Sequence, residues 1–325
     1  MLYNHRSSVT LWRIPRVDHT FFLIIKAARP RQWIKNLALY AALVFSGFFF
    51  YDFPRYFFTV TKAFVLFSVL SSSIYIINDI IDLKSDRQHP FKKNRPIASG
   101  KLPVPIALFF AIVGLVSVFF FSLTFSSYFL LLTIAYAALH IFYSFSLKHI
   151  PILDVMAIAT GFILRVYAGA VVVNLHMSVW FLLTVISAAL FLAVGKRQSE
   201  RTLMEGSGNT RKALEHYSQR LLDIYTGMFA NTTWLTYALY AFQSDAYVPA
   251  GKLLQVYTVL PRTFITQKWL MVTVPLVIYG VMRYLQLVYE KNRGESPDKV
   301  LLEDKPLLIA VVLWGLSVMT VLYVF

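Results

Sequence analysis

The sequence contains no cysteine, and this absence excludes disulfide bonds, thiolate nucleophiles and cysteine-ligated metal centres. Charged residues are scarce as well: they make up 14% of the 325 residues, against about 25% in ordinary soluble domains. Acidic residues are the scarcer kind, with 16 Asp and Glu against 31 Lys and Arg. So low a charge content excludes an ordinary soluble globular protein.

An excess of apolar residues accompanies this shortage of charge. Hydrophobic residues make up 58% of the chain, and the mean hydropathy is +0.60. This composition indicates a polytopic membrane protein that has the lipid bilayer as a partner. The net charge of +15 does not require a nucleic acid partner, because membrane proteins collect Lys and Arg in their cytoplasmic loops.

Apolar runs recur along the chain, each close to the ~20 residues that a helix needs to cross a bilayer. The runs lie near 37–51, 60–80, 103–123, 126–147, 152–173, 177–195, 222–243, 266–289 and 306–325. They are long and lack the alternation of barrel strands, which predicts helices. No repeat or linker interrupts the pattern. The sequence therefore predicts one all-α membrane domain over residues 1–325, with about nine transmembrane helices.

The connections between the expected spans are of two kinds. The turns at 122–127 and 171–178 contain no Lys or Arg, whereas the basic connections are 84–101, 196–220 and 290–305. The positive-inside rule places the basic connections in the cytoplasm, with Phe325 outside. Residues 1–20 lack the apolar core of a signal peptide, so we expect a cytoplasmic N-terminal tail. These features predict a multi-pass protein of the plasma (inner) membrane.

Polar residues begin abruptly at the end of the second expected span, in NDIIDLKSDRQHPFKKNRPIASG, residues 78–100. Asp79, Asp82 and Asp86 are three and four residues apart, so on a continuing helix they share one face. Such carboxylates suit Mg²⁺, which takes one or two of them and fills its other positions with water and phosphate oxygens. A magnesium-held diphosphate at the cytoplasmic face is the leading interpretation. The alternative is a solvated loop at the membrane surface.

Basic residues follow the aspartates closely. Lys92, Lys93 and Arg95 lie within ten residues of Asp86, and they supply positive charge for the same phosphates.

Ionisable residues recur at membrane depth between 143 and 170. Asp154 and Arg165 lie in an apolar helix, where charges are costly and usually mark a functional cavity. With Gly161 they form one stripe over three turns. A structural ion pair or a snorkelling Arg165 is the alternative. Tyr143 and Lys148 come just before, where Lys148 can meet a phosphate from the cytoplasmic side.

The connection after the sixth expected span is basic and lacks aspartate. It begins with GKRQSE at 195–200, which contains Lys196, Arg197 and Glu200. No Asp occurs between Asp154 and Asp223, so this connection offers cations rather than a second cluster of carboxylates.

Two segments resemble a known family. NDIIDLKSD is similar to the first aspartate-rich motif, N-D-x-x-D-x-x-x-D, of the UbiA superfamily of intramembrane prenyltransferases, and RPIASG is similar to the segment that follows it there. This resemblance implies a helical bundle in which Mg²⁺ holds a diphosphate at the cytoplasmic mouth. The family's second aspartate-rich motif is not found here, which weakens a plain prenyltransferase interpretation.

Further segments resemble one branch of this superfamily, the decaprenyl-phosphate phosphoribosyltransferases. They are RPRQWIKN at 29–36, YSFSLKH at 143–149, GKRQSE at 195–200, RYLQLVY at 283–289 and SPDKVLLEDKPL at 296–307. The resemblance implies transfer of 5-phosphoribose from phosphoribosyl diphosphate to a polyprenyl phosphate, with Mg²⁺ as cofactor. The residues assigned to metal are Asp79, Asp82 and Asp86, which are also counted as catalytic with Arg165. Those assigned to substrates are Asn78, Lys35, Lys92, Arg95, Tyr143, Lys148, Asp154, Lys196, Arg197 and Glu200.

Two other functions stay open at this point. One is a UbiA-type transfer of a prenyl group from prenyl diphosphate to an aromatic or lipid acceptor. The other is a transporter or lipid-binding scaffold whose buried charges form an ion pathway, although the polar residues gather at one membrane face rather than at the midplane. A homo-oligomer is also left open.

Overall fold

The computed structural model describes residues 17–50, 52–89, 92–204, 217–244, 268–290 and 297–323, and within these ranges every regular element is helical. Local signals explain several helix starts. Proline stands in the first turn of α3 (Phe53–Ile81), α5 (Val104–Ser122) and α12 (Val274–Tyr289), where its missing N–H costs nothing. Ser126 and Ser218 cap α6 (Ser127–Phe145) and α10 (Gln219–Gln243) by accepting a backbone N–H. The predicted all-α fold is confirmed.

The remaining elements are of two sizes. The long helices are α7 (Leu153–Val172), α8 (Val179–Met204) and α14 (Lys305–Tyr323). The short α-helices are α1 (Val17–Ala28), α2 (Ala41–Phe45), α4 (Leu83–Gln88) and α13 (Pro297–Glu303). The 3-10 helices are η1 (Pro30–Tyr40), η2 (Lys92–Asn94), η3 (Leu147–His149) and η5 (Trp269–Thr273).

Seven helices in the described part of the chain are long and apolar enough to cross a membrane, so the expected number of about nine is not confirmed. Two expected spans are not among the seven. The first residues of the run at 37–51 are the last residues of η1, and the next five form the short helix α2. The run at 222–243 does form a helix, α10, but polar residues such as Asn231 and Thr233 lower its hydropathy.

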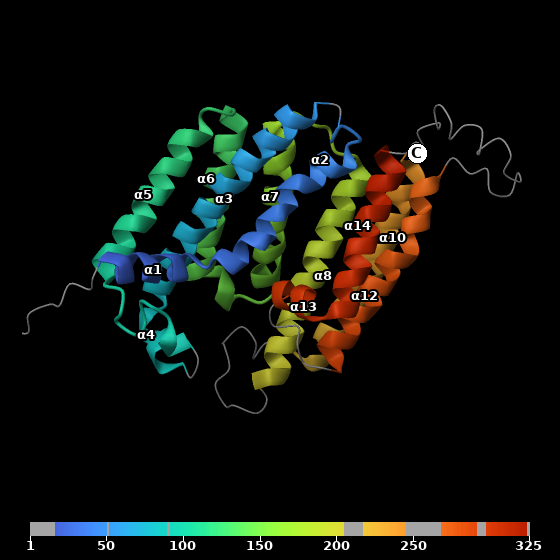
Figure 1. Ribbon diagram of the computed structural model, residues 1–325. Coiled ribbons are helices and arrows are strands. Elements are labelled where there is room, and N and C mark those ends of the chain that lie inside the picture. The colour runs from blue at the N-terminus through green and yellow to red at the C-terminus, as the bar shows by residue number, and fades with distance from the viewer. Residues whose placement is uncertain are drawn as a thin grey trace, which may run out of the picture.

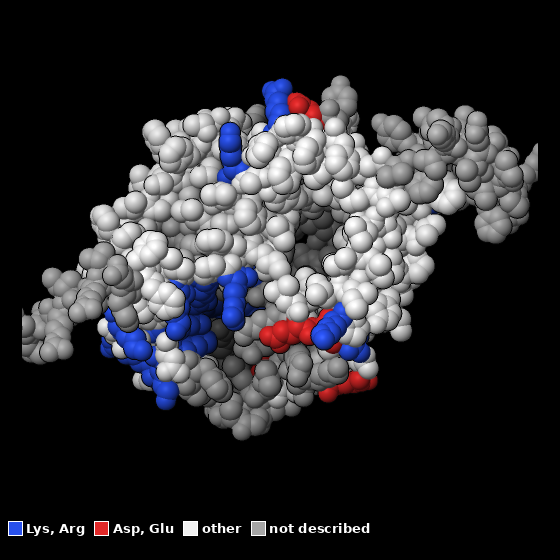
Figure 2. All heavy atoms as spheres, in the orientation of Figure 1, with Lys and Arg blue, Asp and Glu red and all other residues white. Residues whose placement is uncertain are grey.

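The long helices run side by side as a bundle (Figure 1). Helices α3, α5, α6 and α7 make one half, and α8, α10, α12 and α14 make the other. Helix α4, the end of α8 and α13 lie at one end of the bundle, which we call the α4 end. The turn between α5 and α6 and the end of α14 lie at the opposite end. Lys and Arg gather near the α4 end on the face shown in Figure 2, beside a hollow.

The 3-10 helix η1 is unusual because it extends over eleven residues, whereas 3-10 runs beyond three or four residues are uncommon. Arg29 precedes it in a left-handed conformation with φ 55°. Trp33 Nε1 donates to Ser72 Oγ of α3 at 2.9 Å, and Asn36 Nδ2 donates to Ser68 Oγ at 3.1 Å. These bonds fix η1 against α3.

On its other side η1 contacts α7. A Cβ atom at Gly169 would lie 1.9 Å from the carbonyl oxygen of Leu39, so only glycine permits the two backbones to approach this closely. Residues 1–16 of the expected N-terminal tail and Arg211 of the basic connection lie outside the described residues.

Candidate active site

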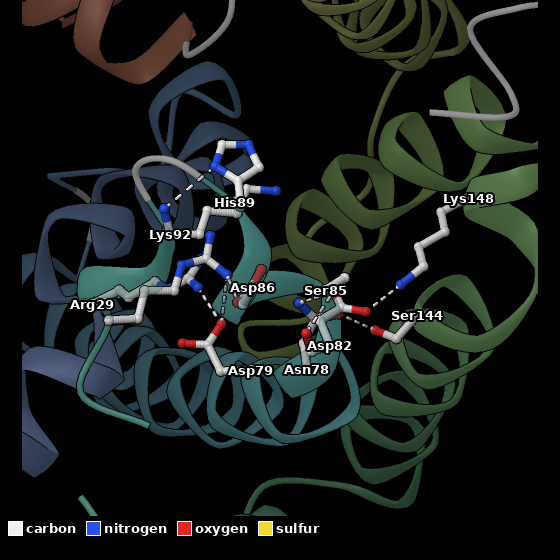
Figure 3. Close-up of polar contacts among 11 residues, drawn as sticks. Arg29, Asn78, Asp79, Asp82, Ser85, Asp86, His89, Lys92, Ser144 and Lys148 are labelled. Atoms are coloured by element: carbon white, nitrogen blue, oxygen red, sulfur yellow. Dashed lines mark hydrogen bonds and ion pairs between the residues drawn. The ribbon is translucent and has the colours of Figure 1, made fainter. Parts of the chain in front are cut away.

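The aspartate stretch lies where α3 ends and α4 begins. Asp82 ends α3 with φ −84° and ψ 6°, and α4 starts at the next residue. Across this break the three carboxylates do not share one helix face as expected. Asp79 and Asp86 lie on one side, and Asp82 points to the other, toward α6 and η3 (Figure 3).

Asp79 and Asp86 meet on one guanidinium group. Arg95 Nη1 donates to Asp79 Oδ1 at 3.1 Å and also to Asp86 Oδ2. Arg29 pairs with the same Asp79 oxygen. The two carboxylate side chains are only 2% and 3% exposed, whereas Arg29 and Arg95 are 27% and 25% exposed. The two arginines therefore cover the carboxylates from the solvent side, and we call these four residues the aspartate–arginine cluster.

Asp82 has a cation of its own. Lys148 Nζ of η3 lies 2.6 Å from Asp82 Oδ1, and Asn78 Nδ2 donates to Asp82 Oδ2 at 3.3 Å. Ser144 Oγ of α6 donates to Asn78 Oδ1 at 2.7 Å (Figure 3). The structure thus brings Asn78, Asp82 and Lys148 together, as the sequence predicted for neighbours of one site.

The cluster offers two carboxylates, Asp79 and Asp86, as possible ligands of a magnesium ion. Among the described residues, no group of three or more His, Asp or Glu side chains converges on one point. Asp79 and Asp86 do converge, on a nitrogen that carries positive charge. Because Mg²⁺ commonly takes one or two protein carboxylates and leaves the rest to water and phosphate, this pair is sufficient. Lys92 lies beside it, with its backbone N–H 3.4 Å from His89 Nδ1.

A second polar cluster surrounds Arg197, at the α4 end of α8. Arg197 Nε lies 2.6 Å from Asp154 Oδ2 of α7, and Nη1 pairs with Glu200 one turn further along α8. Arg197 Nη2 donates to Tyr143 OH of α6 at 2.8 Å. The Arg197 side chain is only 2% exposed. The structure thus brings four predicted residues together, but it buries Arg197 between two carboxylates.

Tyr217 completes this Arg197 cluster. Its hydroxyl donates to Asp154 Oδ1 at 2.8 Å and accepts the backbone N–H of Ile152, which has a left-handed φ of 69°. Burial raises the pKa of Tyr217 above its ordinary value, and the bond to Asp154 acts in the same direction. The hydroxyl therefore stays protonated and remains a donor. The cluster ties the start of α7 to the residue that precedes α10.

Arg165 lies apart from both clusters. Its Nε donates to Asn36 Oδ1 at 2.9 Å, its Nη1 donates to the carbonyl oxygen of Gly161 at 2.9 Å, and its Nη2 donates to Tyr136 OH. The guanidinium also lies 4.8 Å from the centre of the Tyr136 ring. The partner of Asp154 is Arg197 rather than Arg165. These contacts join α7 to η1 and α6, and the predicted catalytic role of Arg165 stays a prediction.

An apolar cavity of about 480 Å³ lies among η1, α7, α8, α10, α12 and α14. Its wall includes Phe162, Phe191, Tyr237, Val277, Tyr284 and Trp314. Two predicted cations, Lys35 of η1 and Lys196 of α8, also line it. Lys196 Nζ lies 3.8 Å from Glu200 Oε1, so the cavity adjoins the Arg197 cluster.

Two contributors were missed among the predicted site residues. Arg29 pairs with Asp79 across fifty residues of sequence, and Tyr217 bonds to Asp154 across sixty-three. Arg29 belongs to the segment RPRQWIKN, and the spacing of basic residues in this segment could have indicated that Arg29 is a site residue. Tyr217 had no comparable signal beyond its place in a polar connection.

Comparison with known proteins supports the resemblance. Residues 37–302 match the model of the UbiA prenyltransferase family. The decaprenyl-phosphate phosphoribosyltransferase of Corynebacterium glutamicum is 34% identical over 93% of this chain and 87% of its own. That of Mycolicibacterium smegmatis is 36% identical over 90% of this chain and 89% of its own.

The fold agrees with these matches. A UbiA homologue from Archaeoglobus fulgidus, solved bound to GPP and Mg²⁺, superposes with a TM-score of 0.63 at 19% identity, covering 92% of this chain and 99% of its own. The structure of the homologue bound to Cd²⁺ gives a TM-score of 0.60 at 18% identity, with coverage of 92% and 99%. The chain belongs to the UbiA prenyltransferase family.

Proposed function

We propose that this protein transfers 5-phosphoribose from phosphoribosyl diphosphate to a polyprenyl phosphate and releases diphosphate. The names of relatives at 34% and 36% identity over most of both chains support this reaction. The observation that carries it is that the structure has two separate sites of different chemistry. Buried carboxylates under arginines lie in one half of the bundle, and an apolar cavity with two lysines lies among helices that belong mainly to the other.

The donor's diphosphate belongs at the aspartate–arginine cluster. Asp79 and Asp86 would hold Mg²⁺ there, and the ion supplies charge stabilisation to the departing diphosphate. Arg29 and Arg95 are about one quarter exposed and present planar groups of N–H donors, which suit phosphate oxygens. Lys148 lies next to Asp82 and contributes a further cation on the opposite side.

The lipid acceptor belongs in the apolar cavity. A polyprenyl chain gains from burial among Phe162, Tyr237 and Trp314, and its phosphate needs a cation at the edge of that surface. Lys35 and Lys196 line the same cavity and meet this need.

Positioning, rather than proton transfer, carries the proposed chemistry. The acceptor phosphate is already anionic near neutral pH, so it needs little general-base help to attack the ribose. Asn78 would act by holding Asp82, the partner of Lys148. Tyr143, Asp154 and Glu200 would act by holding Arg197 in place. We place the site on the cytoplasmic face of the plasma membrane, because the described parts of the basic connections, which include α4, the end of α8 and α13, lie at one end of the bundle.

The direct test uses purified protein in nanodiscs with radiolabelled phosphoribosyl diphosphate, Mg²⁺ and a set of polyprenyl phosphates. We expect labelled lipid to form only when all three are present. Asp79→Asn and Asp86→Asn should reduce it to background, whereas Asp52→Asn, a matched change at the exposed start of α3, should not. Transfer of a prenyl group from prenyl diphosphate to an aromatic acid, with phosphoribosyl diphosphate left unused, would favour the prenyltransferase alternative.

A further inference from the structure

We propose that the site admits its metal only together with a diphosphate, because Arg95 and Arg29 already contact the two carboxylates that would hold the metal. This inference rests on the proposed function only in assuming that the aspartate–arginine cluster receives a metal-held diphosphate. It concerns the order in which metal and substrate bind.

The geometry provides the first step. Arg95 Nη1 contacts both Asp79 Oδ1 and Asp86 Oδ2, and these are the two carboxylates that would hold the metal. Arg29 forms an ion pair with the same Asp79 oxygen. Both carboxylates are almost fully buried beneath these arginines. A cation that arrives from solvent must therefore move at least one guanidinium group before it reaches either carboxylate.

Charge provides the second step. Within the aspartate–arginine cluster, Asp79 and Asp86 bring two negative charges, and Arg29 and Arg95 bring two positive ones. The charges of these four residues therefore balance. A divalent cation alone would give this partly buried cluster a surplus of positive charge, which is costly in a medium of low dielectric constant.

A diphosphate removes both obstacles at once. It neutralises the metal's charge, and its oxygens accept the N–H groups of Arg29 and Arg95 when these leave the carboxylates. The arginines thus exchange one anion for another and are never left unpaired. Both ligands require the same movement of Arg29 and Arg95 away from the carboxylates. We therefore expect metal and diphosphate to strengthen each other's binding.

The first measurement needs no variant. Mn²⁺ binding to the wild-type protein in nanodiscs is followed by electron paramagnetic resonance, with and without inorganic diphosphate, and corrected for Mn²⁺–diphosphate complexes in protein-free solution. We expect weak binding of Mn²⁺ alone and binding roughly ten- to a hundredfold tighter with diphosphate, the range that charge-assisted contacts supply. Equal affinity in both conditions overturns the proposal.

The second measurement removes the positive charge of one arginine at a time. Arg95→Gln, and separately Arg29→Gln, should tighten the binding of Mn²⁺ alone and reduce the gain from diphosphate. Arg87→Gln is the matched control, because Arg87 lies in the same segment and donates to the carbonyl oxygen of Ala98. If Arg87→Gln tightens Mn²⁺ binding as much as Arg95→Gln, net charge explains the result and the specific displacement is wrong.

The outcomes separate this inference from the proposed function. Linked binding of Mn²⁺ and diphosphate without any transfer of phosphoribose supports the inference and contradicts the proposed reaction. Active transfer by a protein that binds Mn²⁺ tightly without diphosphate does the reverse.

Discussion

Arg197 is a single side chain that joins three helices, and its removal should cost stability before it affects any substrate. Arg197→Ala leaves Asp154 buried without its cation and removes the nearer of two cations from Glu200; breaking a comparable buried pair costs about 3–5 kcal/mol. We therefore expect a marked fall in the thermal unfolding temperature in detergent. Arg201→Ala, one turn further along the same helix and less buried, should show a much smaller fall.

The same variant tests the sequence prediction that Arg197 binds a phosphate. If Arg197→Ala unfolds like the wild type but uses phosphoribosyl diphosphate poorly, Arg197 contacts the substrate directly. A loss of stability with an unchanged KM at low temperature indicates a positioning role.

Lys148 should matter for activity rather than for stability. Its ammonium group pairs with Asp82, which is 26% exposed and so remains accessible to a ligand. Lys148→Gln removes a charge-assisted contact, and we expect phosphoribose transfer to fall roughly ten- to a hundredfold with little change in unfolding temperature. Lys101→Gln, at an exposed position, serves as the control and should retain activity.

The sequence predicted which of these residues lie near one another better than how they pair. Asp79, Asp86 and Arg95 lie close in sequence, and their pairing follows from local chain geometry. Arg29 and Tyr217 reach their partners only through the packing of distant helices, which a single sequence does not contain. Arg165 shares an α7 stripe with Asp154, yet bonds to η1 and α6 instead.

Among the elements, η1 depends on one glycine of α7. A Cβ at Gly169 would collide with the carbonyl oxygen of Leu39, and backbone cannot yield as a flexible side chain can. Gly169→Ala should therefore lower stability by about 1–3 kcal/mol and shift η1. Gly227→Ala, in α10 with open space around it, should be neutral or slightly stabilising because alanine favours helix. Thermal unfolding of the two variants in the same detergent makes the comparison.

Helix α10 forms at the expected span 222–243 but is not among the seven helices that are apolar enough to cross a membrane. Its threonines lower the hydropathy of the run, but Thr226, Thr233 and Thr236 donate to backbone carbonyls within the helix. Their hydroxyls are thereby satisfied without water, and the helix packs on α8. The break at Asp82 was not predicted either, because the sequence there contains neither Gly nor Pro.

For the whole molecule, orientation in the membrane can be measured directly, because a chain without cysteine gives no background labelling. Lys84 in α4 and Thr124 in the turn between α5 and α6 are exposed at opposite ends of the bundle. With an impermeant maleimide added to intact cells, Thr124→Cys should react and Lys84→Cys should react only after lysis. The reverse pattern would contradict a cytoplasmic site.

The all-helical membrane fold was predicted well, since composition and run length nearly determine it. Treatment of residues 1–325 as one domain and the oligomeric state stay predictions, and a single sequence with no partner chain contains little information on either.

The length of η1 sets the distance between the two proposed substrate sites. Arg29 at its start pairs with Asp79, and Lys35 further along lines the apolar cavity. Within η1, the five steps from Pro30, next to Arg29, to Lys35 rise about 10 Å along the axis at ~2.0 Å each. Because η1 is fixed against α3 and α7, the backbone positions of Arg29 and Lys35 are held this far apart. Under the proposed function, the backbone of η1 thus fixes the distance between the diphosphate of the sugar donor and the phosphate of the lipid. A donor with a longer or shorter distance between its diphosphate and its reacting carbon would bind without reacting.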